Sequence, residues 1–232
     1  MKSPSLTNQN QETLEMKHRS IITALFACGV LACASASAQN SPWSVRLGAA
    51  HLGFNTQADV VLGGAAVPGA NAEASNNTTV GLEIGYSLSP EWTGRFLLGV
   101  PPTTTLTGTG TLTGTGTLGK AKYGPAALTL TYGVGQWGPI KPYVGGGVAY
   151  NIVFKTTDGF ISNLDVKNSF GTVLQVGFEV PLEGGWSIGL DARKIFLKAK
   201  ATGTVPAFGG APVKANIKLD PLVIFASVGK KF

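Results

Sequence analysis

Six charged side chains lie within segments whose large apolar residues alternate with small or polar ones. Three are basic and three are acidic: Arg46, Glu83, Arg95, Glu179, Asp191 and Arg193. Each occupies one of the alternate positions between the large apolar residues. On a strand, such positions have the opposite parity and lie on the opposite face. Buried charges need partners, so we expect an ion-paired network if these faces meet in one interior. The alternative is that the six only fill and stabilise that interior.

The sequence offers little for catalysis. Beyond residue 38 the chain has one histidine, His51, and no His-x-Ser arrangement of the kind that lipid-modifying barrel enzymes would need. That segment also lacks cysteine, metal-ligand clusters and phosphate-binding glycine motifs. We therefore predict a protein that is not an enzyme and uses no metal and no cofactor. His51 shares the parity of Val45 and Leu47, which favours a position at an interface between membrane and water.

Eight segments show the period-2 alternation of a half-buried strand. They span residues 43–54, 79–88, 92–100, 123–135, 141–155, 168–181, 186–201 and 219–232. Beyond Arg193 the apolar residues Ile195 and Leu197 take the other parity, which predicts a β-bulge there.

The connections between these segments alternate between long and short. The long ones include residues 55–78, 105–118, 156–167 and 202–214, which we expect to be loops. Residues 105–118 hold a repeated Thr-Gly hexad, for which an extension of the hairpin is the alternative to a mobile outer loop. Only 13% of the residues are charged, 32 are glycines, and no apolar stretch reaches the ~20 residues of a membrane helix. These features predict an all-β fold, an eight-stranded antiparallel up-and-down transmembrane β-barrel formed by residues 39–232 as a single domain.

The N-terminal segment, residues 1–38, has the features of a secretory signal peptide behind a short upstream extension. A basic stretch begins at Met16, the expected natural start; an apolar stretch spans residues 21–31, and Ala36-Ser37-Ala38 is a cleavage site. We expect the mature chain to begin at Gln39 and to reach the bacterial outer membrane. Lipidation of Cys33 is a less favoured alternative.

The C-terminal strand ends on Phe232, which resembles the C-terminal signature of outer-membrane barrels and implies recognition by the barrel-assembly machinery. Aromatic residues near the short connections predict an interfacial girdle at that end of the barrel. They are Tyr86, Trp92, Trp137, Tyr143, Trp186 and Phe232.

An eight-stranded barrel has a lumen that side chains can fill. The six charges lie towards the short connections, so we expect a charged plug in the periplasmic half. Leu52, Phe54, Val223 and Phe225 follow the inward parity near the opposite end and predict a hydrophobic upper lumen. Ordinary packing beneath the loops is the alternative for these four.

The chain resembles the OmpW family of small outer-membrane proteins over residues 39–232. The resemblance rests on Lys141-Pro142-Tyr143-Val144-Gly145-Gly146-Gly147 with Tyr150-Asn151, on Trp186 leading into Asp191-Ala192-Arg193, on Asp220-Pro221 and Phe232, and on Pro101-Pro102-Thr103. It differs at Lys230 and in the Thr-Gly hexads. The resemblance implies passive passage of small hydrophobic molecules.

A non-transporting receptor or surface-structural barrel, acting through its external loops, is the alternative function. Expected partners are outer-membrane lipid and lipopolysaccharide, hydrophobic solutes and the assembly machinery, but not nucleic acid. The lipopolysaccharide contact is expected at external lysines, above all Lys198, Lys200, Lys214 and Lys218. The alternative is that these lysines only keep the loops soluble.

Overall fold

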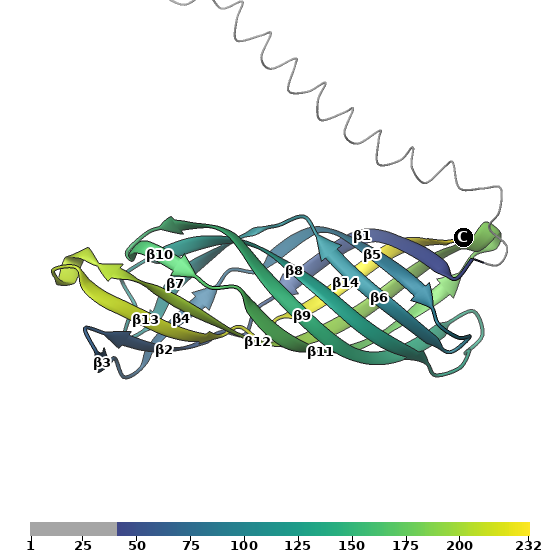
Figure 1. The fold of residues 1–232 in the computed structure, drawn as a ribbon, viewed down its shortest axis with the longest axis horizontal. Coiled ribbons are helices and arrows are strands. Elements are labelled where there is room, and N and C mark those ends of the chain that lie inside the picture. Colours follow the sequence, from purple (N-terminus) through teal and green to yellow (C-terminus); the bar gives the residue numbers. More distant parts are fainter. Residues whose placement is uncertain (1–40) are drawn as a thin grey trace, which may run out of the picture. The chain divides into compact units, whose positions relative to one another are not determined.

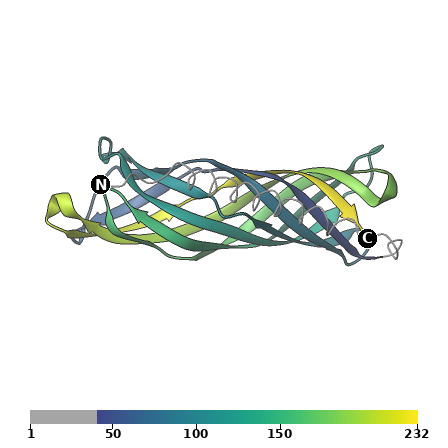
Figure 2. The same ribbon diagram turned by 90° about the horizontal axis from the view of Figure 1, so that it is seen from above.

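The computed structural model describes residues 41–232, so the predicted signal peptide, its start at Met16 and the cleavage site before Gln39 lie outside the described residues. Pro42–Lys231 form one compact unit. Its wall is a closed ring of eight antiparallel strands, each paired with the next and the last paired with the first (Figures 1 and 2). The strands are β1 (Trp43–Gly53), β5 (Asn77–Ser87), β6 (Trp92–Gly99), β8 (Thr117–Gly133), β9 (Lys141–Asp158), β11 (Ser169–Pro181), β12 (Trp186–Val205) and β14 (Leu222–Lys231). The predicted fold class is confirmed.

The outer face of this ring is apolar, as the alternation predicts. On β5, for example, Val80, Leu82 and Ile84 are exposed, whereas Gly81 and Glu83 between them are buried. Exposed apolar side chains at every second position suit a wall that faces lipid. Within residues 41–232, no helix has the length and apolar character needed to cross a membrane.

Six further strands extend one end of the barrel, at the opposite end from the short turns (Figure 1). They are β2 (Gln57–Leu62), β3 (Ala65–Ala66), β4 (Ala70–Ala74), β7 (Thr103–Gly110), β10 (Ser162–Val166) and β13 (Ala211–Lys218). The expectation of loops was wrong for much of residues 55–78, 156–167 and 202–214, whereas β7 pairs with β8 and extends the hairpin, the alternative expected for residues 105–118. Strands β8, β9 and β12 are 17, 18 and 20 residues long, well beyond the ~9–11 residues of a membrane strand. Their projecting edges pair with the added strands, including the first Thr-Gly hexad in β7.

The predicted bulge after Arg193 does not occur. Strand β12 pairs with β11 without a register shift from Ser187 to Leu197, and Asp191, Arg193, Ile195 and Leu197 are all buried. The parity is therefore continuous, and it is the lining of the interior that changes from charged to apolar. A register shift does occur between Lys122 and Tyr123 of β8.

An aromatic girdle surrounds the short-turn end. Trp43 and Tyr86 pack with ring centroids 4.7 Å apart, and Trp92 and Tyr132 with centroids 5.0 Å apart. All four are exposed, as aromatic residues at a membrane interface are. The expectation for Tyr143 was wrong because this residue has the inward parity and is buried inside the barrel.

Candidate functional site: a two-part lumen

Glu83 is the centre of a buried ion network inside the barrel. Its Oε1 lies 2.9 Å from Arg46 Nη1 and 3.0 Å from Arg95 Nη1, and its Oε2 pairs with Arg193 Nη2. The side chain of Glu83 is 0% exposed. Strand pairing sets the first contact, because Arg46 of β1 lies directly opposite Glu83 of β5.

Two further carboxylates complete the network. Asp191 lies 3.0 Å from Arg193 Nε and 3.5 Å from Arg46 Nη2. Glu179 lies 3.0 Å from Arg95 Nη1 and 3.5 Å from Arg46 Nη1. Glu179 is the most exposed of the six, at 27%, and it borders a hollow of about 360 Å³ at the short-turn end. The structure thus brings together all six charged residues that the sequence singled out.

Neutral polar side chains belong to the same network. Tyr143 accepts a hydrogen bond from Arg46 Nη1 and donates one to Asp191 Oδ2, both 3.1 Å long. Ser227 accepts from Arg46 Nε at 3.1 Å, and Thr131 accepts from Arg95 Nε at 3.0 Å. Sequence reasoning missed these residues as partners, although their inward parity was a signal that could have found them.

Glycines make room for the long charged side chains. A Cβ atom at Gly189 would collide with the guanidinium of Arg46. At Gly81 a Cβ atom would lie 2.8 Å from Cε2 of Phe225. The ion network and the ring above it therefore depend on small residues in the facing strands.

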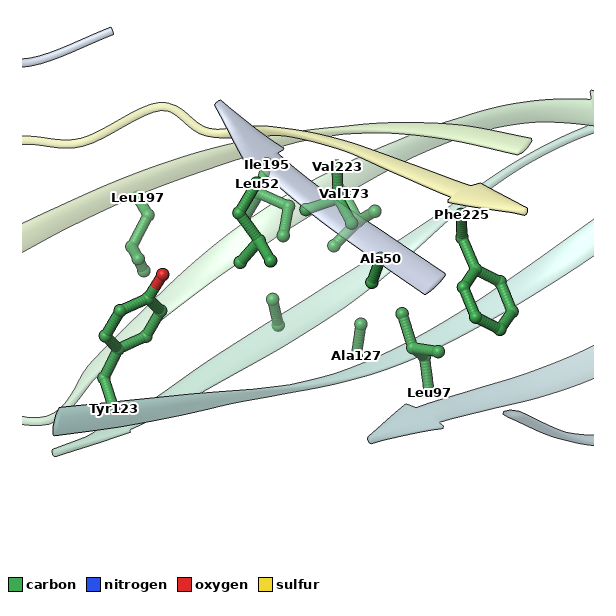
Figure 3. Packing of buried hydrophobic residues seen from close by; sticks show 11 residues of the cluster. Ala50, Leu52, Leu97, Tyr123, Ala127, Val173, Ile195, Leu197, Val223 and Phe225 are labelled. Carbon is green, nitrogen blue, oxygen red and sulfur yellow. The ribbon is translucent and has the colours of Figure 1, made fainter. Parts of the chain in front are cut away.

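Phe225 separates the charged part of the lumen from an apolar part. Its side chain is fully buried, and its ring centroid lies 5.7 Å from Arg46 Cζ and 5.8 Å from Arg193 Cζ. Figure 3 shows Phe225 at one end of the buried apolar cluster and Tyr123 and Leu197 at the other.

The structure places the four residues expected in a hydrophobic upper lumen inside this apolar part. Leu52, Val223 and Phe225 belong to the buried cluster, and Phe54 packs against it, with its ring centroid 5.9 Å from that of Tyr123. Their position follows from strand pairing, since Leu52 lies opposite Val223.

Two cavities occupy the apolar part. The inner one has a volume of about 50 Å³ and is lined by residues that include Leu52, Phe54, Tyr123, Ile195, Leu197 and Ala199. The outer one has a volume of about 240 Å³, and the six added strands supply much of its lining, for example Val60, Leu62 and Val213. Leu106 and Ile217 line both cavities. No charged residue lines either cavity, and the lining is mostly apolar, with Thr104, Asn151, Thr111 and Thr115 as its polar members.

The barrel wall is interrupted beside the inner cavity. Pairing of β6 with β8 ends where Leu97 lies opposite Ala127, and pairing of β7 with β8 begins only where Thr103 lies opposite Lys122. The backbone hydrogen bond from Tyr123 N to Pro102 O, 3.0 Å long, bridges this stretch. Pro125, which lines the inner cavity, has no N–H to contribute to the ladder. We call this stretch, residues 98–102 facing 123–126, the wall seam.

The only histidine among residues 41–232 does not lie in the lumen. His51 is exposed on the outer face and shares a 2.9 Å hydrogen bond with Thr78. Among residues 41–232, no cluster of three or more His, Cys, Asp or Glu residues could hold a metal ion.

A lipid-facing ring of eight strands with short turns at one end and an extended opposite end defines a bacterial outer-membrane β-barrel. The chain belongs to the OmpW family, whose model matches residues 42–232. Barrels of this family are transport or structural proteins rather than enzymes, in agreement with the expectation from the sequence, and the outer membrane is the location of the protein.

Three relatives illustrate the similarity. The dibenzothiophene metabolism operon protein PahQ of Pseudomonas aeruginosa is 37% identical over 195 residues, covering 84% of this chain and 90% of PahQ. The outer membrane protein AlkL of Ectopseudomonas oleovorans is 34% identical over 166 residues, covering 72% of this chain and 71% of AlkL. The crystal structure of OprG from Pseudomonas aeruginosa superposes with a TM-score of 0.76 at 25% identity, covering 82% of this chain and 95% of OprG.

Proposed function

We propose that the barrel provides passive passage for small hydrophobic molecules. The observation that carries this proposal is the apolar lumen, whose two cavities share Leu106 and Ile217 above Phe225. An uncharged apolar solute would gain free energy by leaving water for this lining, at about 25 cal/mol per Å² of apolar surface buried. An ion would lose its hydration there without gaining a partner.

The ion network would act as a plug on the periplasmic side. It holds three cationic and three anionic side chains in mutual contact, with Glu83 touching all three arginines. A hydrophobic solute that displaced these groups would have to break buried ion pairs, which is costly. In this proposal the network therefore prevents the solute from passing beyond Phe225 towards the short-turn end.

The wall seam would provide the exit. Val100 within the seam and Leu128 beside it are 61% and 55% exposed on the outer face, so the seam opens onto the apolar band of the wall. A solute that leaves the inner cavity past Pro125 would enter the lipid directly. Such a route needs no opening through the charged network.

The names of relatives support the class of solute. PahQ is described as a protein of a dibenzothiophene metabolism operon. Dibenzothiophene is an uncharged, three-ring aromatic compound, which is the kind of molecule that an apolar lumen can admit. By this likeness we propose apolar aromatic compounds as solutes of the present barrel.

Uptake of a hydrophobic solute by cells with and without the protein tests the proposal. We expect faster uptake of dibenzothiophene by cells that make the barrel, with no change for a charged solute of similar size. Equal uptake by both strains, with a folded barrel in the outer membrane, would contradict passage. It would favour the alternative of a receptor or structural barrel that acts through its external strands.

A matched pair of substitutions, each replacing an alanine with leucine, tests whether the solute passes through the lumen. Ala199 and Ala192 lie on the same strand, β12, but Ala199 lines the inner cavity and Ala192 has the outward parity. We expect Ala199→Leu to fill the inner cavity and slow uptake several-fold, whereas Ala192→Leu leaves uptake unchanged. The melting temperature of both variants must stay near that of the parent for the comparison to hold. Unchanged uptake in a folded Ala199→Leu variant would exclude this cavity from the route.

We also propose that residues 1–38 direct export and are removed before Gln39, and that Phe232 marks the last strand for the barrel-assembly machinery. The supporting observations are the Ala36-Ser37-Ala38 sequence and the position of Phe232 directly after β14.

A further inference from the structure

Eight exposed lysines surround one side of the extended end of the barrel. This lysine arc consists of Lys120, Lys122, Lys155, Lys167, Lys198, Lys200, Lys214 and Lys218. Its members lie on β8, β9, β12 and β13 and just after β10. By contrast, residues 41–119 contain no lysine, so β2, β4 and β7 on the other side carry none. The positive charge is therefore concentrated on one side.

The arc places like charges directly opposite each other. Lys122 of β8 lies opposite Lys155 of β9, and Lys198 of β12 lies opposite Lys218 of β13. Lys167 donates its backbone N–H to the carbonyl of Lys200, which brings two further lysines close together. Like charges in directly opposite positions destabilise a sheet. An anion close to both lysines of a pair would offset this repulsion.

The chain supplies only part of that compensation. Lys167 pairs with Asp165 at 2.5 Å, and Lys218 pairs with Asp220 at 3.3 Å. Within the described residues, Lys198, Lys200 and Lys214 form no ion pair. These three exposed ammonium groups lie on the adjacent strands β12 and β13, with Thr202 opposite Lys214.

The arc begins where the exposed apolar band ends. On β12 the exposed Phe196 is followed on the same face by Lys198 and Lys200. On β9 the exposed Phe154 is followed by the exposed Lys155, at the register shift that keeps Lys155 opposite Lys122. Long lysine stems can lie along apolar surface while the ammonium reaches the polar layer. The arc therefore lies at the level of the head groups of the outer leaflet.

We propose that the lysine arc binds the phosphate groups of lipopolysaccharide on this side of the barrel. Lysine binds phosphate as a point charge, and several phosphates on one lipid can neutralise the opposed lysine pairs together. This contact concerns the outer face, so it does not depend on whether the lumen transports a solute.

Two matched triple variants test the proposal. The first, Lys198→Gln with Lys200→Gln and Lys214→Gln, removes three neighbouring arc lysines that form no ion pair within residues 41–232. The control, Lys141→Gln with Lys230→Gln and Lys231→Gln, removes the same charge at the short-turn end. The measured quantity is the rise in melting temperature that purified lipopolysaccharide causes in full-length protein extracted from membranes into detergent. We expect the arc variant to lose most of this rise and the control to keep the rise of the parent.

A second set of measurements identifies the group on the lipid that is bound. Lipopolysaccharide from which the lipid A phosphates have been removed should stabilise the parent much less than the intact lipid does. The difference between parent and arc variant should also shrink at high salt, because exposed charges are screened. An equal rise for parent and arc variant, or an equal rise with the dephosphorylated lipid, would overturn the proposal.

Discussion

Replacing Glu83 with Gln is expected to lower the free energy of unfolding by about 3–5 kcal/mol, the usual cost of removing one member of a buried ion pair. Glu83 is fully buried and contacts Arg46, Arg95 and Arg193. Gln keeps the shape of the side chain but removes its charge. The three arginines would then face only Glu179 and Asp191, and the network would carry one uncompensated positive charge.

Denaturant unfolding of the barrel in lipid or detergent measures this loss. Glu73→Gln is a suitable control because Glu73 is exposed and forms no ion pair within residues 41–232. The double variant Glu83→Gln with Arg193→Met restores equal numbers of positive and negative charges, so we expect it to recover part of the lost stability. If Glu83→Gln unfolds at the same denaturant concentration as the parent, the buried network does not stabilise the barrel.

Much of the fold and of the site could be predicted because, in a barrel, the parity of a residue along its strand decides whether its side chain points into the lumen or outward. Every strand sends alternate side chains inward, so Arg46, Glu83 and Asp191 meet in one lumen although they are far apart in the sequence. The same rule predicted that Leu52 and Val223 lie inside, and they face each other across the β1–β14 pair.

The external strands could not be predicted because their formation depends on partners. Residues 70–74, ANAEA, have little intrinsic tendency to form a strand, yet they pair with the Thr-Gly segment in β7. That segment in turn pairs with the projecting part of β8. The position of the wall seam likewise depends on where the β6–β8 and β7–β8 pairings end. Those ends are known only from the strand register in the structure.

Two residue-level predictions were wrong. Ile195 and Leu197 predicted a bulge because their apolar side chains suggested a lipid-facing position, and Tyr143 predicted a membrane interface because it lies near a short connection. In fact the lining changes with depth, and an inward position can hold Arg193 near one end and Leu197 further along. Tyr143 shares the inward parity of Gly145 and Gly147, and this parity predicts its buried position.

Joining the two sides of the wall seam is expected to abolish most of the uptake that the barrel supports. Gly124 and Pro101 are neighbours across the seam, since a Cβ atom at Gly124 would lie 3.4 Å from Pro101 Cγ. The side chains of residues 101 and 124 therefore meet across the seam, which makes this pair the choice for an engineered disulfide, whose Cβ atoms lie about 3.5–4.5 Å apart. Residues 41–232 contain no cysteine, so Pro101→Cys with Gly124→Cys introduces the only thiol pair there. A disulfide would hold the seam closed and leave the lumen and the ion network unchanged.

The most direct measurement compares dibenzothiophene uptake by cells carrying this double variant in its oxidised and reduced states. Each single cysteine variant serves as a control, because it changes the side chain but cannot form the link. We predict that oxidation removes most of the difference in uptake between cells with and without the barrel and that a reductant restores it. Equal uptake in the two states, with the disulfide shown to have formed, would contradict a route through the apolar lumen and out through the wall seam.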